Sequence, residues 1–251
     1  MCRLRVERVE KHFGGLAALA DVSLEAAPGE RRAIIGPNGA GKTTLFNLIS
    51  GELAPGRGRI LLGQRDITRL PVHQRANLGL ARTFQRNNLF LKLSVFENVR
   101  LAVQHHRQTA ANLFKPVARF RQVNEETTAL ITRLGLAAEG GQPAARLSYG
   151  QQRALEVALA LATEPDVLLL DEPSAGMSPA ETAEMVKLIR SLPKALTLLI
   201  VEHDMDVVFS LADRITVLHY GRVISEGEPA AVRADPAVQE IYLGSDRAAE
   251  C

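Results

Sequence analysis

Hydrophobic and polar positions in the first third of the chain predict strands, a glycine-rich loop and one short helix. Residues 4–35 are typical of strands with turns between them: residues 22–26 alternate apolar with polar side chains, and residues 28–30 (Pro-Gly-Glu) predict a turn. A helix is expected over residues 42–50, directly after the glycine-rich loop. Residues 59–62 indicate one further strand.

The middle of the chain, residues 94–163, has a mostly helical pattern. Within it, residues 108–122 are polar and basic with little periodicity, which indicates a loop or a frayed helix. Residues 137–145 contain two glycines and a proline and are typical of a linker.

Short apolar strands alternate with helical segments in the last third of the chain. The strands are expected at residues 167–170, 197–201 and 215–218. Such alternation predicts a mainly parallel sheet flanked by helices. We therefore expect an α/β core, formed by residues 1–85 and 164–251, that is interrupted by a helical segment of residues 86–163.

The composition narrows the functional class. The 251 residues carry 30 basic and 28 acidic side chains, so a net charge of +2 gives no bias toward nucleic acid. No apolar run approaches the roughly 20 residues of a membrane helix, and the first ten residues show no apolar signal segment. Cys2 and Cys251 lie at the two ends, where we expect free thiols in a reducing compartment rather than a disulfide.

A phosphate-binding loop is the first motif that carries chemistry. Gly36, Gly41, Lys42 and Thr43 satisfy the pattern G-x-x-x-x-G-K-[ST], and Gly39 adds a third glycine. The glycines let the backbone curl and point successive N–H groups inward, next to the positive end of the following helix. Lysine would reach the β- and γ-phosphates, and the threonine hydroxyl would bind Mg²⁺. The alternative is a glycine-rich turn before a helix with no ligand.

Two carboxylates end the apolar run of residues 167–170. Ligands bind beyond the carboxyl ends of strands in open α/β sheets, so Asp171 is expected to hold Mg²⁺ through water. Glu172 is expected to polarise a water that attacks the γ-phosphorus. The alternative is a strand that ends in solvated acids.

Residues 147–153, LSYGQQR, resemble the signature motif of the ATP-binding cassette ATPases. Ser148 and Gln151 also form an S-x-x-Q capping box, which defines a helix N-terminus able to bind an anion. The resemblance implies that Ser148, Gly150 and Gln151 contact a nucleotide held by a second chain, whereas the residues alone allow a plain capped helix. It further implies a RecA-like P-loop core with an N-terminal antiparallel β part and an inserted helical subdomain that carries the signature.

Other positions match the same family one by one. Gln85 matches the glutamine loop, which contacts Mg²⁺ and the attacking water and lies at the hinge to the helical segment. His203 matches the switch histidine, a ligand of the γ-phosphate, and Phe13 matches the aromatic residue that stacks on adenine. The matching phosphate loop also includes Asn38 and Thr44. The alternatives are a surface glutamine, a structural histidine and a core phenylalanine.

Two positions depart from the family pattern. Tyr149 stands where the third signature residue is usually glycine. Ser178 stands where the loop after Glu172 usually carries aspartate, and Ser178, Pro179 and Glu181 together predict a capping box, so we expect Ser178 to be a helix cap.

The amino-acid sequence from residue 4 to residue 244 closely resembles those of the ATP-binding subunits of branched-chain amino acid importers. The resemblance implies that the chain binds ATP and Mg²⁺. It implies as partners transmembrane permease subunits, a second ATPase subunit in a homo- or heterodimer and, indirectly, a solute-binding protein. It also implies a peripheral position on the cytoplasmic face of the inner membrane. It also implies a groove near Gln85 that receives a permease helix; the apolar residues Leu89, Phe90, Leu91 and Leu93 either line it or pack inside the helical segment.

Three alternative functions stay open. Related ATPases for urea or amide import, or for lipopolysaccharide export, have similar sequences. A cassette ATPase outside transport is disfavoured because the chain has no coiled coil and one copy of each motif. A kinase or GTPase is disfavoured because no N-K-x-D occurs and the signature would be unexplained.

Overall fold

Six strands form the central sheet, in an order that differs from their order in the chain. The computed structural model describes residues 3–83, 89–107 and 120–241. From one edge to the other, the sheet consists of β10 (Arg222–Gly227), β9 (Arg214–His219), β3 (Arg31–Ile35), β8 (Thr197–Val201), β7 (Val167–Asp171) and β6 (Leu80–Arg82). The five strands from β9 to β6 are parallel, and β10 pairs antiparallel with β9. The prediction of a mainly parallel sheet is confirmed.

The central strands are buried on both faces. Residues 167–170 of β7 are fully buried, as a continuous aliphatic run predicts for a parallel strand covered on two sides. Because successive side chains of a strand point to opposite faces, Val167 and Leu169 pack in one core cluster with α1 (Lys42–Ser50). Leu168 and Leu170 pack in a second cluster with α5 (Tyr149–Leu161) and α6 (Pro179–Ser191).

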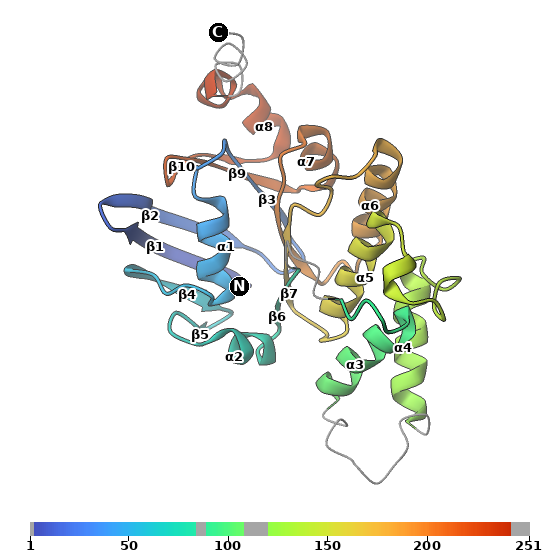
Figure 1. Cartoon of the computed structure of the whole chain (residues 1–251). Coiled ribbons are helices and arrows are strands. Elements are labelled where there is room, and N and C mark those ends of the chain that lie inside the picture. Colours follow the sequence, from blue (N-terminus) through green and yellow to red (C-terminus); the bar gives the residue numbers. More distant parts are fainter. Residues whose placement is uncertain (1–2, 84–88, 108–119, 242–251) are drawn as a thin grey trace.

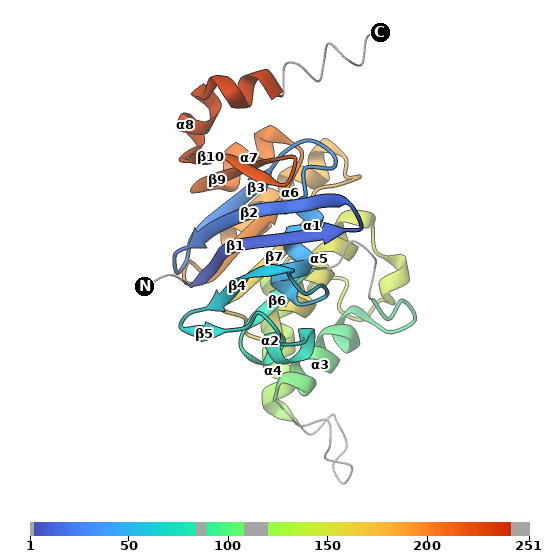
Figure 2. The ribbon, with the colours of Figure 1, turned by 90° about the vertical axis from the view of Figure 1, so that its left-hand side faces the viewer.

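A second, antiparallel sheet covers the other side of α1. Its strand order is β2 (Leu16–Ala26), β1 (Leu4–Phe13), β4 (Arg57–Leu62) and β5 (Arg65–Asp66). Leu4, Val6 and Val9 of β1 join the cluster that contains α1 and one face of the central sheet. Helix α1 is therefore enclosed between two sheets, as Figures 1 and 2 show.

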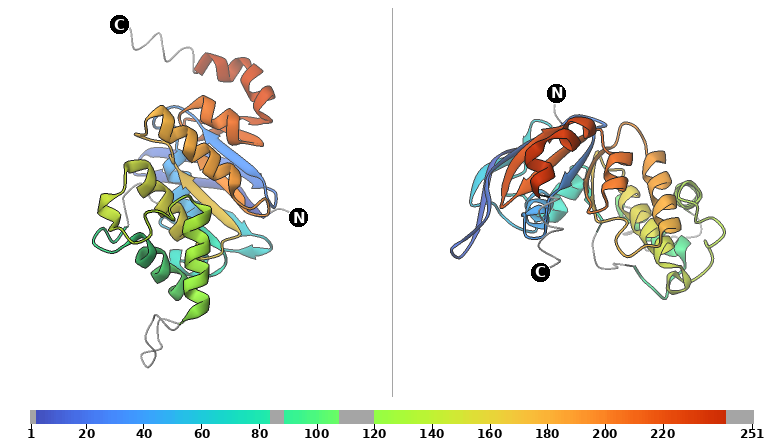
Figure 3. Two further views of the ribbon diagram at one scale, coloured as in Figure 1. Left: turned by 90° about the vertical axis from the view of Figure 1, so that its right-hand side faces the viewer. Right: turned by 90° about the horizontal axis from the view of Figure 1, so that it is seen from above.

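The helices gather mainly on the opposite face of the central sheet, away from the antiparallel sheet (Figure 3). Further helices are α2 (Val72–Asn77), α3 (Val95–His106), α4 (Arg121–Arg133), a 3₁₀ turn (Ala144–Arg146), α7 (Met205–Leu211) and α8 (Pro229–Ala234). Residues 236–241 are also helical. Helices α3, α4 and α5 share one apolar cluster that continues onto β7 and β8. Among the described residues, no helix combines the length and the apolar character needed to cross a membrane.

The α/β fold class predicted from the sequence is confirmed, while smaller elements were not foreseen. Strand β6 and helix α2 lie between residues 63 and 93, where we predicted no strand and no helix. Strand β10, which pairs with β9, was also not predicted. The predicted loop of residues 108–122 lies mostly outside the described residues, and α4 already begins at Arg121. The division into a core of residues 1–85 and 164–251 and a helical segment of residues 86–163 stays a prediction.

Arg75 fixes the C-terminal end of α1. Its guanidinium is fully buried and donates to the carbonyl oxygens of Leu48 at 2.6 Å and Ile49 at 2.7 Å. It also donates to the carbonyl oxygens of Thr68 at 2.9 Å and Leu70 at 2.8 Å. The last carbonyls of a helix have no partner within the helix, and a cation there also complements the helix dipole. Arg75 thereby holds in place the helix whose first residue is Lys42.

We predict that Arg75→Met lowers the free energy of unfolding by about 3 kcal/mol, because it leaves several buried carbonyl oxygens without a donor. Urea unfolding followed by circular dichroism measures the change. The control is Arg69→Met, at an exposed position in the same segment, which should shift stability by less than about 0.5 kcal/mol. Equal effects of the two substitutions would contradict this anchoring role.

Candidate functional site

One cavity of about 350 Å³ brings together most of the predicted nucleotide-binding residues. The glycine-rich loop and the start of α1 form its floor, and side chains from the ends of β7, β8 and β1 reach it. The predicted residues that line it are Phe13, Asn38, Gly39, Gly41, Lys42, Thr43, Thr44, Glu172 and His203. Leu16 and Tyr220 also line it and were not predicted.

The loop between β3 and α1 depends on glycine at its two ends. Gly36 has φ +151° and Gly41 has φ +105°, which are conformations that favour glycine. A Cβ atom at Gly36 would collide with the carbonyl oxygen of Leu218 on β9, and one at Gly41 would lie 2.7 Å from the carbonyl oxygen of Ala18. Gly41 is also the N-cap of α1, and as a glycine it has no side chain that could accept a hydrogen bond from the first N–H groups of the helix. The first N–H groups of α1 are therefore available to an anion.

Lys42 is folded back onto its own loop. Its ammonium donates to the carbonyl oxygens of Gly36 at 2.6 Å and Pro37 at 3.0 Å. Burial lowers the pKa of Lys42, while the nearby carboxylates of Glu172 and Asp171 raise it. The side chain thus stands close to the acidic residues at the end of β7, with its charge held by loop carbonyls that a phosphate can replace.

Asp171, the last residue of β7, has one carboxylate oxygen that is hydrogen-bonded and one that has no partner among the described residues. Oδ2 accepts a hydrogen bond from Arg82 Nη2 at 2.7 Å. Oδ1 is buried and has no hydrogen-bond partner within the described part of the chain. A buried, unpaired oxygen is costly by itself, and carboxylate and hydroxyl oxygens are the donors that Mg²⁺ prefers. Thr43 lines the nucleotide cavity, and Asp171 directly precedes Glu172, which lines it as well. The oxygen atoms of Thr43 and Asp171 therefore fit a magnesium ion.

Glu172 and His203 contact each other directly. His203 Nε2 lies 2.6 Å from Glu172 Oε1, and both side chains are partly exposed to the cavity. Glu172 has φ +48°, a left-handed conformation that a non-glycine residue adopts at a cost. Its backbone N–H donates to the carbonyl oxygen of Val201 at 2.9 Å, which ties it to the neighbouring strand β8.

Glu202, which sequence reasoning missed, joins the loops that carry these two residues. It is buried and accepts hydrogen bonds from the backbone N–H of Ser174 at 2.9 Å and from its hydroxyl at 2.6 Å. Its other oxygen accepts from the backbone N–H of His203 at 3.0 Å. The carboxylate of Glu202 therefore ties the loop that follows Glu172 to the backbone of His203. A glutamate directly after an apolar strand was the available signal.

The signature residues lie away from this cavity. Ser148, Gly150 and Gln151 line a different cavity, of about 560 Å³, between α4, α5 and α6. The predicted capping box is present, with Gln151 N donating to Ser148 Oγ and Ser148 N donating to Gln151 Oε1. Gly150 N also donates to Glu181 Oε1 at 3.2 Å. The structure does not bring these three residues together with the phosphate loop of the same chain.

The two departures from the family pattern have local partners. The Tyr149 hydroxyl accepts hydrogen bonds from Arg153 at 2.8 and 3.2 Å, which holds the ring along the first turn of α5. Ser178 caps α6 in a capping box with Glu181, as predicted. Gln85 lies outside the described residues.

The sequence model described as "ABC transporter" matches residues 19–175, and the one described as "Branched-chain amino acid ATP-binding cassette transporter" matches residues 222–248. The high-affinity branched-chain amino acid transport ATP-binding protein LivG of Escherichia coli (strain K12) is 40% identical over 250 residues, which covers 96% of this chain and 97% of LivG. The lipopolysaccharide export system ATP-binding protein LptB of Acidithiobacillus ferridurans is 38% identical over 242 residues, covering 96% of each chain.

A solved structure has the same fold. The ADP conformation of MJ1267, an ATP-binding cassette of an ABC transporter, superimposes with a TM-score of 0.84 at 32% identity, covering 97% of this chain and 99% of MJ1267. Since a family model spans residues 19–175 and relatives near 40% identity cover almost the whole chain, the chain belongs to the ABC transporter family as an ATP-binding cassette.

Proposed function

We propose that this chain binds and hydrolyses ATP to drive the import of branched-chain amino acids through separate permease subunits. The observation that carries the proposal is the cavity in which the phosphate loop, the end of β7 and His203 meet. The match of residues 222–248 to the branched-chain amino acid transporter model, together with the likeness to LivG, supports the solute class.

The roles of the cavity residues follow from their chemistry. The loop N–H groups and Lys42 bind the β- and γ-phosphates, with Lys42 exchanging its two loop carbonyls for phosphate oxygens. Thr43 and Asp171 would hold Mg²⁺, with Gln85 as a further ligand from outside the described residues. A bound Mg²⁺ neutralises negative charge on the phosphate oxygens.

Glu172 and His203 act at the γ-phosphate end of the cavity. Glu172 takes a proton from, and orients, the attacking water. His203 is paired with Glu172 at 2.6 Å, so in the ATP-bound state it exchanges that partner for a γ-phosphate oxygen. Exchange between the two partners gives the histidine a different position before and after hydrolysis.

A complete site requires a second ATPase subunit. Ser148, Gly150 and Gln151 lie on a different cavity from the phosphate loop, so they serve the nucleotide of a facing subunit, in a homo- or heterodimer. At the N-terminus of α5, the N–H groups of Gly150 and Gln151 would exchange their present acceptors, Glu181 Oε1 and Ser148 Oγ, for oxygens of the γ-phosphate, and the Ser148 hydroxyl would donate to the same phosphate. ATP then links two subunits, and its hydrolysis releases them.

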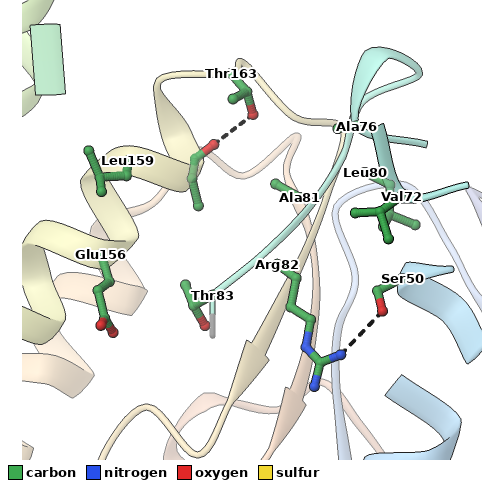
Figure 4. Close-up of a pocket in the computed structure, with 11 residues that line it drawn as sticks. Ser50, Val72, Ala76, Leu80, Ala81, Arg82, Thr83, Glu156, Leu159 and Thr163 are labelled. Atoms are coloured by element: carbon green, nitrogen blue, oxygen red, sulfur yellow. Dashed lines mark hydrogen bonds between the residues drawn. The ribbon is translucent and has the colours of Figure 1, made fainter. Parts of the chain in front are cut away.

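Permease subunits would dock on the surface beside β6. A cavity of about 250 Å³ lies there, lined by residues of α1, α2, β6 and α5 (Figure 4). Phe90, Leu91 and Leu93 are exposed beside α3, whereas Leu89 is buried. An exposed apolar segment and an apolar cavity are each features that suit a short permease helix. With such permease partners, the chain would work as a peripheral protein on the cytoplasmic face of the inner membrane, with a solute-binding protein as an indirect partner.

Lipopolysaccharide export is the second candidate, because LptB is nearly as similar to this chain as LivG is. The C-terminal match to the branched-chain amino acid transporter model favours import. Import of urea or amides by a related system is a further alternative within the same class of protein.

Recovery of the tagged chain from detergent-solubilised native membranes tests the transport assignment. We expect two polytopic permeases and a second ATPase among the partners identified by mass spectrometry. Phe90→Asp, which places a charge on the exposed apolar segment, should reduce their recovery. Lipopolysaccharide-assembly proteins as partners would favour export, and recovery from the soluble fraction alone would contradict both.

We predict that Glu172→Gln lowers the rate of ATP hydrolysis at least about 100-fold while ATP binding persists, because the amide cannot accept the proton of water but keeps the shape of the side chain. Phosphate release measures turnover, and light scattering with ATP should detect a stable dimer. The control Glu240→Gln, at an exposed position on the C-terminal side of α8, should hydrolyse ATP normally. Normal turnover in Glu172→Gln would exclude this residue as the base.

We predict that Ser148→Arg abolishes ATP-driven dimerisation and turnover but leaves ATP binding by the single subunit intact, since the large cation would fill the phosphate site of the facing subunit. It also removes a helix cap, which costs about 1 kcal/mol. Ser94→Ala, which removes the equivalent cap of α3, controls for that loss and should keep turnover. If Ser148→Arg turned over ATP at the wild-type rate, the signature residues would not face a nucleotide.

A further inference from the structure

Exposed aromatic and aliphatic side chains border one end of the nucleotide cavity. In the described part of the chain, nine large hydrophobic residues are exposed, and three of them, Phe13, Leu16 and Tyr220, line this cavity. Phe13 and Leu16 belong to the hairpin between β1 and β2, and Tyr220 belongs to the hairpin between β9 and β10. Tyr220 is 80% exposed, the largest value of the nine. Exposed apolar side chains that gather around a cavity indicate a binding surface.

The backbone conformation of Tyr220 is unfavourable for an aromatic residue. His219 pairs with Arg222, so Tyr220 and Gly221 form a two-residue hairpin loop, with φ +43° and +72°. Two positive φ angles are typical of the hairpin turn in which asparagine, aspartate or glycine usually precedes glycine. A tyrosine at the first position is strained, and its exposed ring adds no burial in return. Folding stability therefore does not account for a tyrosine at residue 220, and a binding role would.

The hairpin is fastened to the phosphate loop, so its position relative to a bound nucleotide is fixed. Gly221 N donates to the carbonyl oxygen of Ala40 at 3.0 Å, and Ala20 N donates to the carbonyl oxygen of Gly221 at 2.8 Å. A Cβ atom at Gly221 would lie 2.6 Å from the carbonyl oxygen of Ala18. These contacts place the ring of Tyr220 at the cavity, where it contacts the ring of His219 with centroids 4.2 Å apart.

We propose that Tyr220 is a second aromatic contact for the nucleoside half of the bound nucleotide, supplied by a different hairpin from Phe13. This inference rests on the proposed ATP-binding function of the cavity. Every nucleobase has an aromatic face that stacks on such side chains, and a tyrosine ring packs on a base or ribose while its hydroxyl stays in water. The phosphate loop holds the charged half of the nucleotide, and the two hairpins hold the uncharged half.

The substitution Tyr220→Asn distinguishes an effect on nucleotide binding from an effect on folding stability. Asparagine suits a positive φ angle, so we expect the thermal midpoint of the nucleotide-free protein to rise or stay level. The dissociation constant for ATP, measured by calorimetry, should increase roughly five- to tenfold, in line with the loss of one stacking contact. Inorganic tripolyphosphate, which has no base or ribose, should bind wild type and variant equally. Tyr220→Phe, which keeps the ring, should bind ATP as the wild type does.

Arg8→Asn is the matched control. Arg8 is exposed, has φ +45°, and does not line the cavity. The substitution should therefore raise the thermal midpoint or leave it level, with no change in ATP affinity.

Each other result would overturn the inference. Equal weakening of ATP and tripolyphosphate would mean that Tyr220 acts through the phosphate loop. Unchanged ATP affinity with slower hydrolysis would mean that the ring contacts the facing subunit and not the nucleoside. A wild-type protein that binds neither ATP nor tripolyphosphate would instead refute the proposed function of the cavity.

Discussion

The parallel pairing of β3, β8 and β7 is the constraint on which the site depends. In this register Ile34 of β3 lies beside Val201 of β8, and Val201 lies beside Asp171 of β7. The phosphate loop, Glu202 and His203, and the Asp171–Glu172 pair each follow one of these strands, so they emerge at the same edge of the sheet. A shift of one strand by one residue would move each buried side chain to the opposite core cluster, where it would no longer fit its neighbours, so the packing of both faces resists slippage. The chemistry of the cavity thus rests on the aliphatic runs that precede it.

The charged side chains at this edge of the central sheet already have polar partners within the protein. Lys42 donates to loop carbonyls, Asp171 accepts from Arg82, and Glu172 contacts His203. A nucleotide with its metal ion therefore exchanges existing contacts for new ones and does not enter a site of uncompensated charge. Oδ1 of Asp171 differs from these groups: it has no hydrogen-bond partner in the part of the chain that the structure describes, and a metal ion would supply one. In the proposed mechanism, this exchange is what makes the site sensitive to the γ-phosphate.

The sequence was sufficient to predict the fold class and the residues of the cavity, because both depend on local patterns. Aliphatic runs mark the central strands, and the spacing of glycines before Lys42 marks the phosphate loop. Contacts between distant residues left no such pattern. Arg82 and Asp171 are far apart in the sequence, Glu202 reaches back to Ser174, and β6 is only three residues long. Tyr220 was missed because its strain is visible in a φ angle and not in the sequence.

Tyr149 connects the two halves of the proposed mechanism within one chain. Its hydroxyl is held by Arg153, and its ring lies within 4 Å of the position that a Cβ atom would occupy at Gly176, in the loop after Glu172. Gly150 N donates to Glu181 on the helix that follows the same loop. The signature helix and the segment after Glu172 are therefore in contact. In the proposed dimer, the signature helix faces the nucleotide of the other subunit, so a shift of that helix on closure would reach the chain's own Glu172 through these contacts. A glycine at residue 149 would lack this side-chain link, which gives the departure from the family pattern a structural consequence.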